Sequence, residues 1–119
     1  MNASPCEAAV RRLDSMAIID LKGDINRSAE GAVNAAYEEA AGSGASQVLL
    51  NFTQVGYINS TGIAVIVAVL ARSRKEGRTL ISCGLSEHYR EIFEITRLSD
   101  FMTIFSDETT ALREAPAPA

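Results

Sequence analysis

The sequence predicts a single α/β domain, with a mixed sheet of four or five strands packed against about four helices. Short apolar runs rich in β-branched residues alternate along the chain with segments whose apolar residues recur at helical spacing. The 119 residues are about one domain's worth, and 47% of them are hydrophobic, which suffices for one core. We expect the domain to cover residues 8–114, between a flexible start at 1–7 and a disordered Ala/Pro tail at 115–119.

The first two strands are expected at 8–13 and 16–21. Asp14-Ser15 is a turn signal between them, and no helical segment intervenes. This arrangement predicts an antiparallel hairpin, and the sheet is then mixed. Lys22-Gly23-Asp24 should end the second strand.

Helices and strands then alternate. A helix is predicted over 28–41, with Ser28 as its N-cap and a Gly-Ser-Gly segment after its last turn. The run 47–52 (QVLLNF) is apolar enough to be a strand inside a sheet. The remaining elements before the tail are expected as strand 79–82, helix 86–97, strand 101–105 and helix 107–114.

The segment around Ile63–Ala71 (IAVIVAVLA) gives conflicting signals. Its β-branched residues favour a strand, but the full run is about 15 residues long, which is typical of a helix. It opens with cap residues and closes at Gly77, so we predict a helix over 60–75. Because it is apolar nearly all round, we expect it to be largely buried. The apolar run is nine residues long, whereas a membrane span needs about 20, so we expect a soluble, cytoplasmic protein without membrane insertion.

Composition argues against several classes of function. The net charge is -4 and the basic residues are scattered, which argues against nucleic-acid binding. Cys6 and Cys83 fit no metal or redox spacing and are expected to be free thiols. His88 is the single histidine, and no P-loop, nucleophile elbow or dinucleotide fingerprint is present. We therefore expect no cofactor, no metal and no enzymatic activity.

One polar motif, Asn59-Ser60-Thr61-Gly62, stands directly before the predicted apolar helix. The first turn of a helix offers unpaired backbone N–H groups and the positive end of the helix dipole, and both stabilise a phosphate. Gly62 would let another chain approach the backbone closely. The same residues are common helix caps, so the pattern alone also fits a purely structural role.

Three segments, in order and spacing, resemble the STAS domain family (sulfate transporter and anti-sigma factor antagonist). The central one, VLLNFTQVGYINSTGIAVIVAVLARSRKEG, resembles the family's strand, its Asp-Ser-Ser/Thr-Gly motif and the apolar helix that follows. Upstream, IIDLKGDIN resembles the strand ending in Leu-x-Gly-Glu/Asp-Leu-Asp. Downstream, EIFEITRLSDFMTIFSDETTAL resembles the last helix, short strand and terminal helix. The resemblance covers roughly residues 8–113.

This resemblance implies the function of a bacterial anti-sigma factor antagonist. Ser60 takes the position of the phosphorylated residue, and the resemblance implies a partner-binding surface at Asn26, Asn59, Ser60, Thr61 and Gly62. In the implied partner switch, the unphosphorylated antagonist binds an anti-sigma factor that is also a serine kinase, and thereby frees a sigma factor. Phosphorylation ends the binding, and a serine phosphatase resets the cycle.

Two residues depart from the family pattern: Asn59 and Asn26 stand where the family has acidic residues. Both changes remove negative charge near the acceptor hydroxyl, which bears on kinase recognition and on repulsion of a bound phosphate. Two other functions remain open at this point. One is an accessory subunit of a lipid or solute ABC transporter, and the other is nucleotide binding, for which no phosphate-cradling loop is seen. Neighbouring genes would distinguish the antagonist from the transporter subunit. Genes for a kinase and a phosphatase would favour the antagonist, and genes for a permease and an ATPase would favour the transporter subunit.

Overall fold

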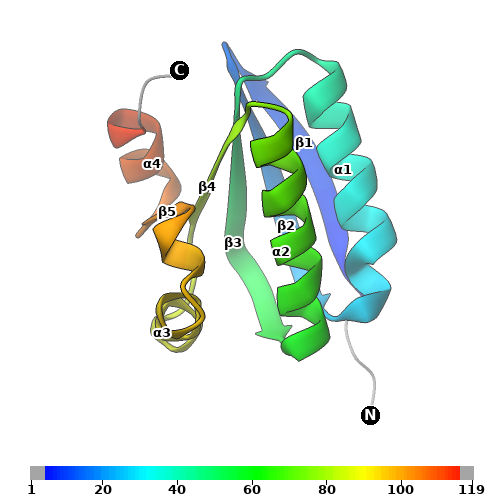
Figure 1. The fold of residues 1–119 in the computed structure, drawn as a ribbon, viewed down its shortest axis with the longest axis vertical. Coiled ribbons are helices and arrows are strands. Elements are labelled where there is room, and N and C mark those ends of the chain that lie inside the picture. Colours follow the sequence, from blue (N-terminus) through cyan, green and yellow to red (C-terminus); the bar gives the residue numbers. More distant parts are fainter. Residues whose placement is uncertain (1–4, 116–119) are drawn as a thin grey trace.

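The computed structural model describes residues 5–115, which form one five-stranded sheet with four α-helices and two short 3-10 helices (Figure 1). The predicted α/β fold with a mixed sheet is thus confirmed. The elements in chain order are β1 (Glu7–Leu13), β2 (Met16–Ile25), η1 (Arg27–Ala29), α1 (Glu30–Gly42), β3 (Gln47–Ile58), α2 (Ser60–Lys75), β4 (Thr79–Cys83), α3 (Glu87–Ile95), η2 (Leu98–Asp100), β5 (Thr103–Phe105) and α4 (Glu108–Glu114).

The strands lie in the sheet in chain order, β1-β2-β3-β4-β5. β1 pairs antiparallel with β2 in the predicted hairpin, and the other neighbouring strands are parallel. The hairpin turn places Asp14 at φ 54°, a left-handed conformation that Asp adopts more readily than most residues. Each parallel connection requires a crossover, and the helices between β2 and β5 supply these connections. In Figure 1, α1 and α2 lie side by side over β1–β3.

Alternation along the strands divides the buried side chains between two cores. The larger core lies between the sheet and helices α1 to α3. Its largest side chains include Ile19, Leu50, Phe52, Tyr37, Ile66 and Phe93. The smaller core lies on the opposite face, where Ala111 of α4 packs on strand residues. Its buried members are Met16, Ile18, Leu49, Ile81, Cys83 and Ala111. Both cores are needed to cover the sheet, because its central strands are apolar on both faces.

Strands β2 and β3 run further than the sequence predicts. Lys22-Gly23-Asp24 does not end β2, which continues to Ile25. Gly23 takes φ 92°, and the register with β3 shifts twice in this region, so the glycine produces an irregularity rather than a break. β3 likewise extends beyond Phe52 to Ile58, because its added residues pair with those of β2. The two strands therefore end side by side.

Helix α2 confirms the helical interpretation of the segment around Ile63–Ala71, but the prediction that it is largely buried was wrong. Its inner face packs into the core through residues such as Val65, Ile66 and Val69. Its outer face stays exposed, although it carries Ala64, Val67, Ala68 and Ala71. A helix lying on a sheet covers it with only one face, and the outer face of α2 points away from the sheet.

Smaller differences concern the ends of elements. α3 stops at Ile95 rather than 97, because Arg97 adopts a left-handed backbone with φ 67°. Residues 98–100 then form η2, so β5 begins at Thr103 instead of 101. The predicted flexible start and disordered tail fall mainly on residues 1–4 and 116–119, which lie outside the described residues, and both stay predictions. Over residues 5–115, no helix combines the length and apolarity needed to cross a bilayer.

Candidate functional site

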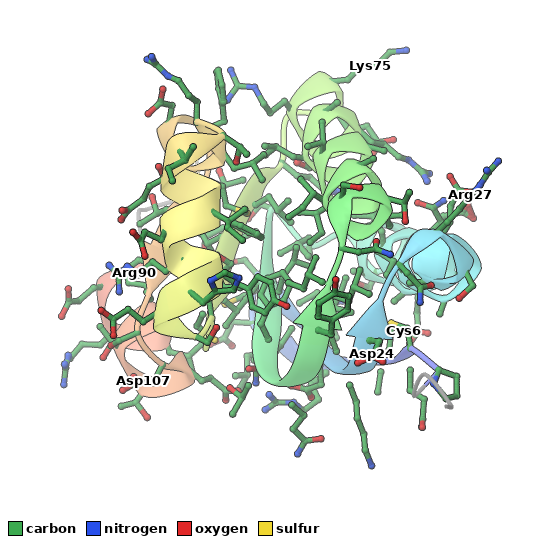
Figure 2. All side chains as sticks on the ribbon, turned by 90° about the horizontal axis from the view of Figure 1, so that it is seen from below. Cys6, Asp24, Arg27, Lys75, Arg90 and Asp107 are labelled. Carbon is green, nitrogen blue, oxygen red and sulfur yellow. The ribbon has the colours of Figure 1, made fainter. Side chains whose placement is uncertain are left out.

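The predicted site lies where β2 and β3 end. Ile25 and Ile58 are paired across the two parallel strands, and Asn26 and Asn59 follow them directly. The backbone N–H of Asn59 donates to the Ile25 carbonyl oxygen at 3.2 Å. Parallel strands present their carboxyl ends at one edge of a sheet, so segments 33 positions apart meet here. Figure 2 looks onto this end of the molecule, with Asp24 and Arg27 labelled on it.

Asn59 is the N-cap of α2. Its side-chain oxygen accepts hydrogen bonds from the Gly62 backbone N–H at 2.8 Å and from the Thr61 hydroxyl at 2.7 Å. Asparagine is among the best capping residues, so the neutral side chain holds the helix start as well as an aspartate would. The cap function predicted for the motif therefore belongs to Asn59 and not to the hydroxyl residues.

Ser60 occupies the first helical position and is exposed. Among residues 5–115 its hydroxyl takes part in no hydrogen bond, whereas that of Thr61 is bound to Asn59. The backbone N–H groups of Ser60 and Thr61 precede the first intrahelical bond, which runs from Ile63 to Asn59. The motif thus presents one unengaged hydroxyl beside the positive end of a 16-residue helix.

Asn26 caps the neighbouring segment. Its side-chain oxygen accepts from the backbone N–H and the hydroxyl of Ser28, at 2.9 and 2.5 Å. This cap begins η1, which leads into α1, so the prediction that Ser28 caps the helix was wrong. The two asparagines lie at adjacent strand ends, yet each side chain is engaged with its own following turn.

Gly62 is required by packing within the chain. It is buried, and a Cβ built on it would overlap the carbonyl group of Ile25. The chain's own β2 thus makes a close approach to this glycine, and the approach of another chain stays a prediction. A side chain here would separate α2 from β2.

The profile of the STAS domain matches residues 7–111 of this chain. The chain belongs to the STAS domain family. A putative anti-sigma factor antagonist, BtrV of Bordetella bronchiseptica, is 32% identical over 91% of this chain and 89% of its own length. Such identity over nearly the whole of both sequences joins this STAS domain to relatives of the antagonist type.

Solved structures give the same fold. An anti-sigma factor antagonist from Mycobacterium paratuberculosis superimposes with a TM-score of 0.77 at 16% identity, covering 91% of this chain and 92% of the other. The Bacillus cell fate determinant SpoIIAA in its phosphorylated form gives a TM-score of 0.67 at 18% identity, covering 89% and 97%. At these identities the likeness concerns the fold alone.

Tyr89 is a residue of the site that sequence reasoning missed. Its hydroxyl accepts a hydrogen bond from the Ile58 backbone N–H at 3.0 Å, in a buried position. Ile58 immediately precedes the capping Asn59, so α3 fixes the end of β3 from which the motif starts. Nothing in the sequence marks the Tyr89 hydroxyl as a partner for the end of β3.

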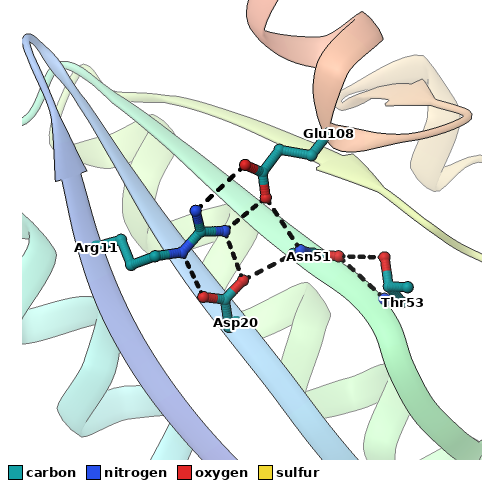
Figure 3. Close-up of polar contacts among 5 residues, drawn as sticks. All are labelled: Arg11, Asp20, Asn51, Thr53 and Glu108. Atoms are coloured by element: carbon teal, nitrogen blue, oxygen red, sulfur yellow. Dashed lines mark hydrogen bonds and ion pairs between the residues drawn. The ribbon is translucent and has the colours of Figure 1, made fainter.

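A polar cluster on the other face of this STAS domain ties its first strand to its last helix (Figure 3). Arg11 of β1 binds Asp20 of β2 at 2.6 Å and Glu108 of α4 at 2.5 Å. Asn51 of β3 donates to both carboxylates, and its own oxygen accepts from Thr53. The hydrogen bond from Arg11 lowers the pKa of Asp20. Asp20 is about one-third exposed in this ion pair, so water still reaches its carboxylate.

Both cysteines are free thiols, as predicted. Cys83 is buried in the smaller core, and its burial raises the pKa of the thiol to about 11. Cys6 is only partly covered, and burial also raises its pKa. Because the thiolate is the reactive form, Cys83 is chemically quiet in the folded protein.

Proposed function

We propose that this STAS domain is an anti-sigma factor antagonist that acts by partner switching, as a binding protein rather than an enzyme. Unphosphorylated, it binds an anti-sigma factor that is also a serine kinase, and phosphorylation of Ser60 ends the binding. A serine phosphatase restores the binding form. Because sigma factors act on transcription, this function belongs to the cytoplasm.

The observation that carries this proposal is the contrast between the two hydroxyls of the motif. Ser60 is exposed and unengaged, whereas Thr61 donates its hydroxyl hydrogen to Asn59. A kinase must reach the hydroxyl oxygen, and phosphate on Thr61 would first have to break the bond to the cap. The names of the relatives, anti-sigma factor antagonists, support the general class of function in this proposal.

A phosphate on Ser60 suits the fold while opposing the complex. The two free N–H groups and the helix dipole favour the anion by about 0.3–1 kcal/mol, so folding stability should change little. In the interface, a group of about -1.5 to -2 charges must lose its hydration or face like charges. A loss of roughly 3–4 kcal/mol would weaken binding by about a hundredfold to a thousandfold.

The first experiment maps the acceptor. The chain is incubated with its anti-sigma factor kinase and ATP, and the product is analysed by mass spectrometry beside the matched variants Ser60→Ala and Thr61→Ala. We expect phosphate on Ser60 in the wild type and in Thr61→Ala, and none in Ser60→Ala. Labelling of Ser60→Ala at the wild-type rate would refute the assignment.

The second experiment measures the switch. Calorimetric titration compares the affinity of the anti-sigma factor for the unmodified and the phosphorylated chain, and melting temperatures show that both are folded. We expect affinity to fall by about a hundredfold or more with little change in melting temperature. Equal affinities would leave Ser60 without a switching role.

Asn59 should tune the phosphorylation step. Asn59→Asp restores the family's carboxylate and keeps a good helix cap, so the fold is unchanged while a negative charge is added beside the acceptor. We expect the phosphorylation rate to change at least several-fold. Identical rates would show that the departure from the family is neutral for the kinase.

A further inference from the structure

An apolar groove lies between the outer face of α2 and the segment that follows α3. Its volume is about 480 Å³. It is lined by the apolar side chains of Val67, Leu70, Ala71, Leu98 and Phe101 together with Arg74 and Arg97. Val67 and Phe101 are 43% and 54% exposed, so two large apolar side chains meet solvent side by side in one concavity. Contiguous apolar surface of this kind marks a binding site more often than an ordinary surface.

The charge around this α2–η2 groove is positive, although the chain as a whole carries -4. Arg97 is paired with Asp100 at 2.7 Å, but Arg74 instead stacks on the Phe101 ring, 5.1 Å from its centroid. Within residues 5–115, neither Arg74 nor Lys75 has a carboxylate at ion-pair distance. Cations at the end of α2 stabilise its dipole, yet that role does not account for the apolar groove beside them.

The groove is continuous with the phosphorylation motif. The exposed positions Ser60, Ala64, Val67, Ala71 and Arg74 follow one another at spacings of three or four residues, so they form one face of α2. At 1.5 Å per residue, Ser60 lies about 21 Å from Arg74 along the helix. This length fits within the side of a standard protein interface. An exposed helix face would normally carry charged residues, whereas this one carries none before its last turn.

We propose that the anti-sigma factor released by phosphorylation at Ser60 also occupies the α2–η2 groove, through an apolar ridge bordered by carboxylates. This inference rests on the proposed function and extends its interface to the far end of α2. The ridge would fill the space between Val67 and Phe101, and its carboxylates would pair with Arg74 and Lys75. A concave groove suits a protein ridge, whereas the flat surface of a bilayer would leave it empty.

The test measures binding of the purified anti-sigma factor to the full chain by calorimetric titration. Val67→Glu and Phe101→Ser remove the apolar contacts, and Arg74→Glu reverses the charge. Leu112→Ser and Arg113→Glu are the matched controls, because both lie exposed on α4, away from the groove. We expect each groove variant to weaken binding at least tenfold and the controls to stay within about twofold. Melting temperatures verify the fold of all five variants.

The outcomes separate this inference from the proposed function. Groove variants that bind like wild type, while phosphorylation of Ser60 still abolishes binding, would refute the groove and leave the switch intact. If the wild-type chain does not bind the anti-sigma factor, both proposals fail. Vesicles of equal parts phosphatidylglycerol and phosphatidylcholine serve as a second probe. Vesicle binding lost in the groove variants, with unchanged anti-sigma factor binding, would overturn the inference in favour of a membrane surface.

Discussion

Replacing Gly62 with alanine tests whether the motif glycine serves the fold. A Cβ at this position would lie 2.6 Å from the carbonyl carbon of Ile25 and 3.2 Å from its Cγ2 atom. Ile25 is fully buried and cannot withdraw, because its carbonyl oxygen also accepts the Asn59 N–H. Relief therefore requires α2 to move away from β2, which disturbs the capping bond from Gly62 to Asn59.

The magnitude follows from these contacts. Overpacking of a well-filled interior costs about 1–3 kcal/mol, and loss of a capping bond adds about 1 kcal/mol. We therefore expect Gly62→Ala to lower the free energy of unfolding by about 2–4 kcal/mol. For a domain of this size each kcal/mol shifts the melting temperature by about 4 °C, so the midpoint should fall by about 8–16 °C.

The assay is thermal unfolding followed by circular dichroism, with Gly31→Ala as the matched control. Gly31 lies in the first turn of α1, and among residues 5–115 no atom outside the nearby helix backbone and the two chain neighbours lies within 4 Å of a Cβ built on it. The same substitution there should cost nothing and can stabilise the helix by up to about 1 kcal/mol. A Gly62→Ala protein that melts within roughly 2 °C of wild type would refute the packing argument.

Three further predictions concern other parts of the molecule. Tyr89→Phe leaves the buried N–H of Ile58 without its acceptor, so urea unfolding should show a loss of about 1–3 kcal/mol; an unchanged midpoint would exclude that role. The hydrogen bond from Arg11 is the main cause that lowers the pKa of Asp20 (Figure 3). The ion pair of Asp20 therefore stabilises the fold at neutral pH. This stability is lost as the pH falls below the ordinary pKa of an aspartate, toward the lower pKa of Asp20 in the folded protein. Because the pair is partly exposed, Asp20→Asn should cost at most about 1 kcal/mol at pH 7 and less at pH 3, and an equal cost at both values would contradict this account. A thiol reagent at pH 8 should label Cys6 well before Cys83, whose thiol has a pKa of about 11; equal rates in the folded protein would contradict its burial.

Much of the fold could be predicted from the sequence because the apolar periodicity reflects burial directly. The hairpin, the alternation of strands and helices and the helical state of the segment around Ile63–Ala71 all follow from pattern and length. The ends of β2 and β3 could not be predicted in this way. Lys22-Gly23-Asp24 has the composition of a turn, but pairing with β3 holds it in the sheet. Tertiary hydrogen bonding outweighs local propensity there.

The motif of the candidate site could be predicted from the sequence, but the hydrogen bonds between its residues could not. The sequence marks Ser60 as a hydroxyl at a helix start, but only the structure shows that the Asn59 cap binds Thr61 and leaves Ser60 unengaged. Likewise, a glycine in a motif can be required for several reasons. At Gly62 the structure identifies one of them, because a Cβ there would overlap Ile25. Both facts depend on where β2 ends relative to α2, which no local pattern encodes.

The bridge from Arg11 to Glu108 joins residues 97 positions apart. Because α4 follows every strand of the sheet in the sequence, the ribosome synthesises it after all the strands. The smaller core, which α4 covers, is therefore completed after the strands have been made. A nascent chain that has emerged only through β5 would expose Ile18, Leu49 and Ile81 to other chains. That face is covered only when α4 packs on it. Arg11 and Asp20 are already present on the hairpin, where Arg11 can bind Glu108 of α4. The order of synthesis therefore makes α4 the last step in protecting the sheet from aggregation.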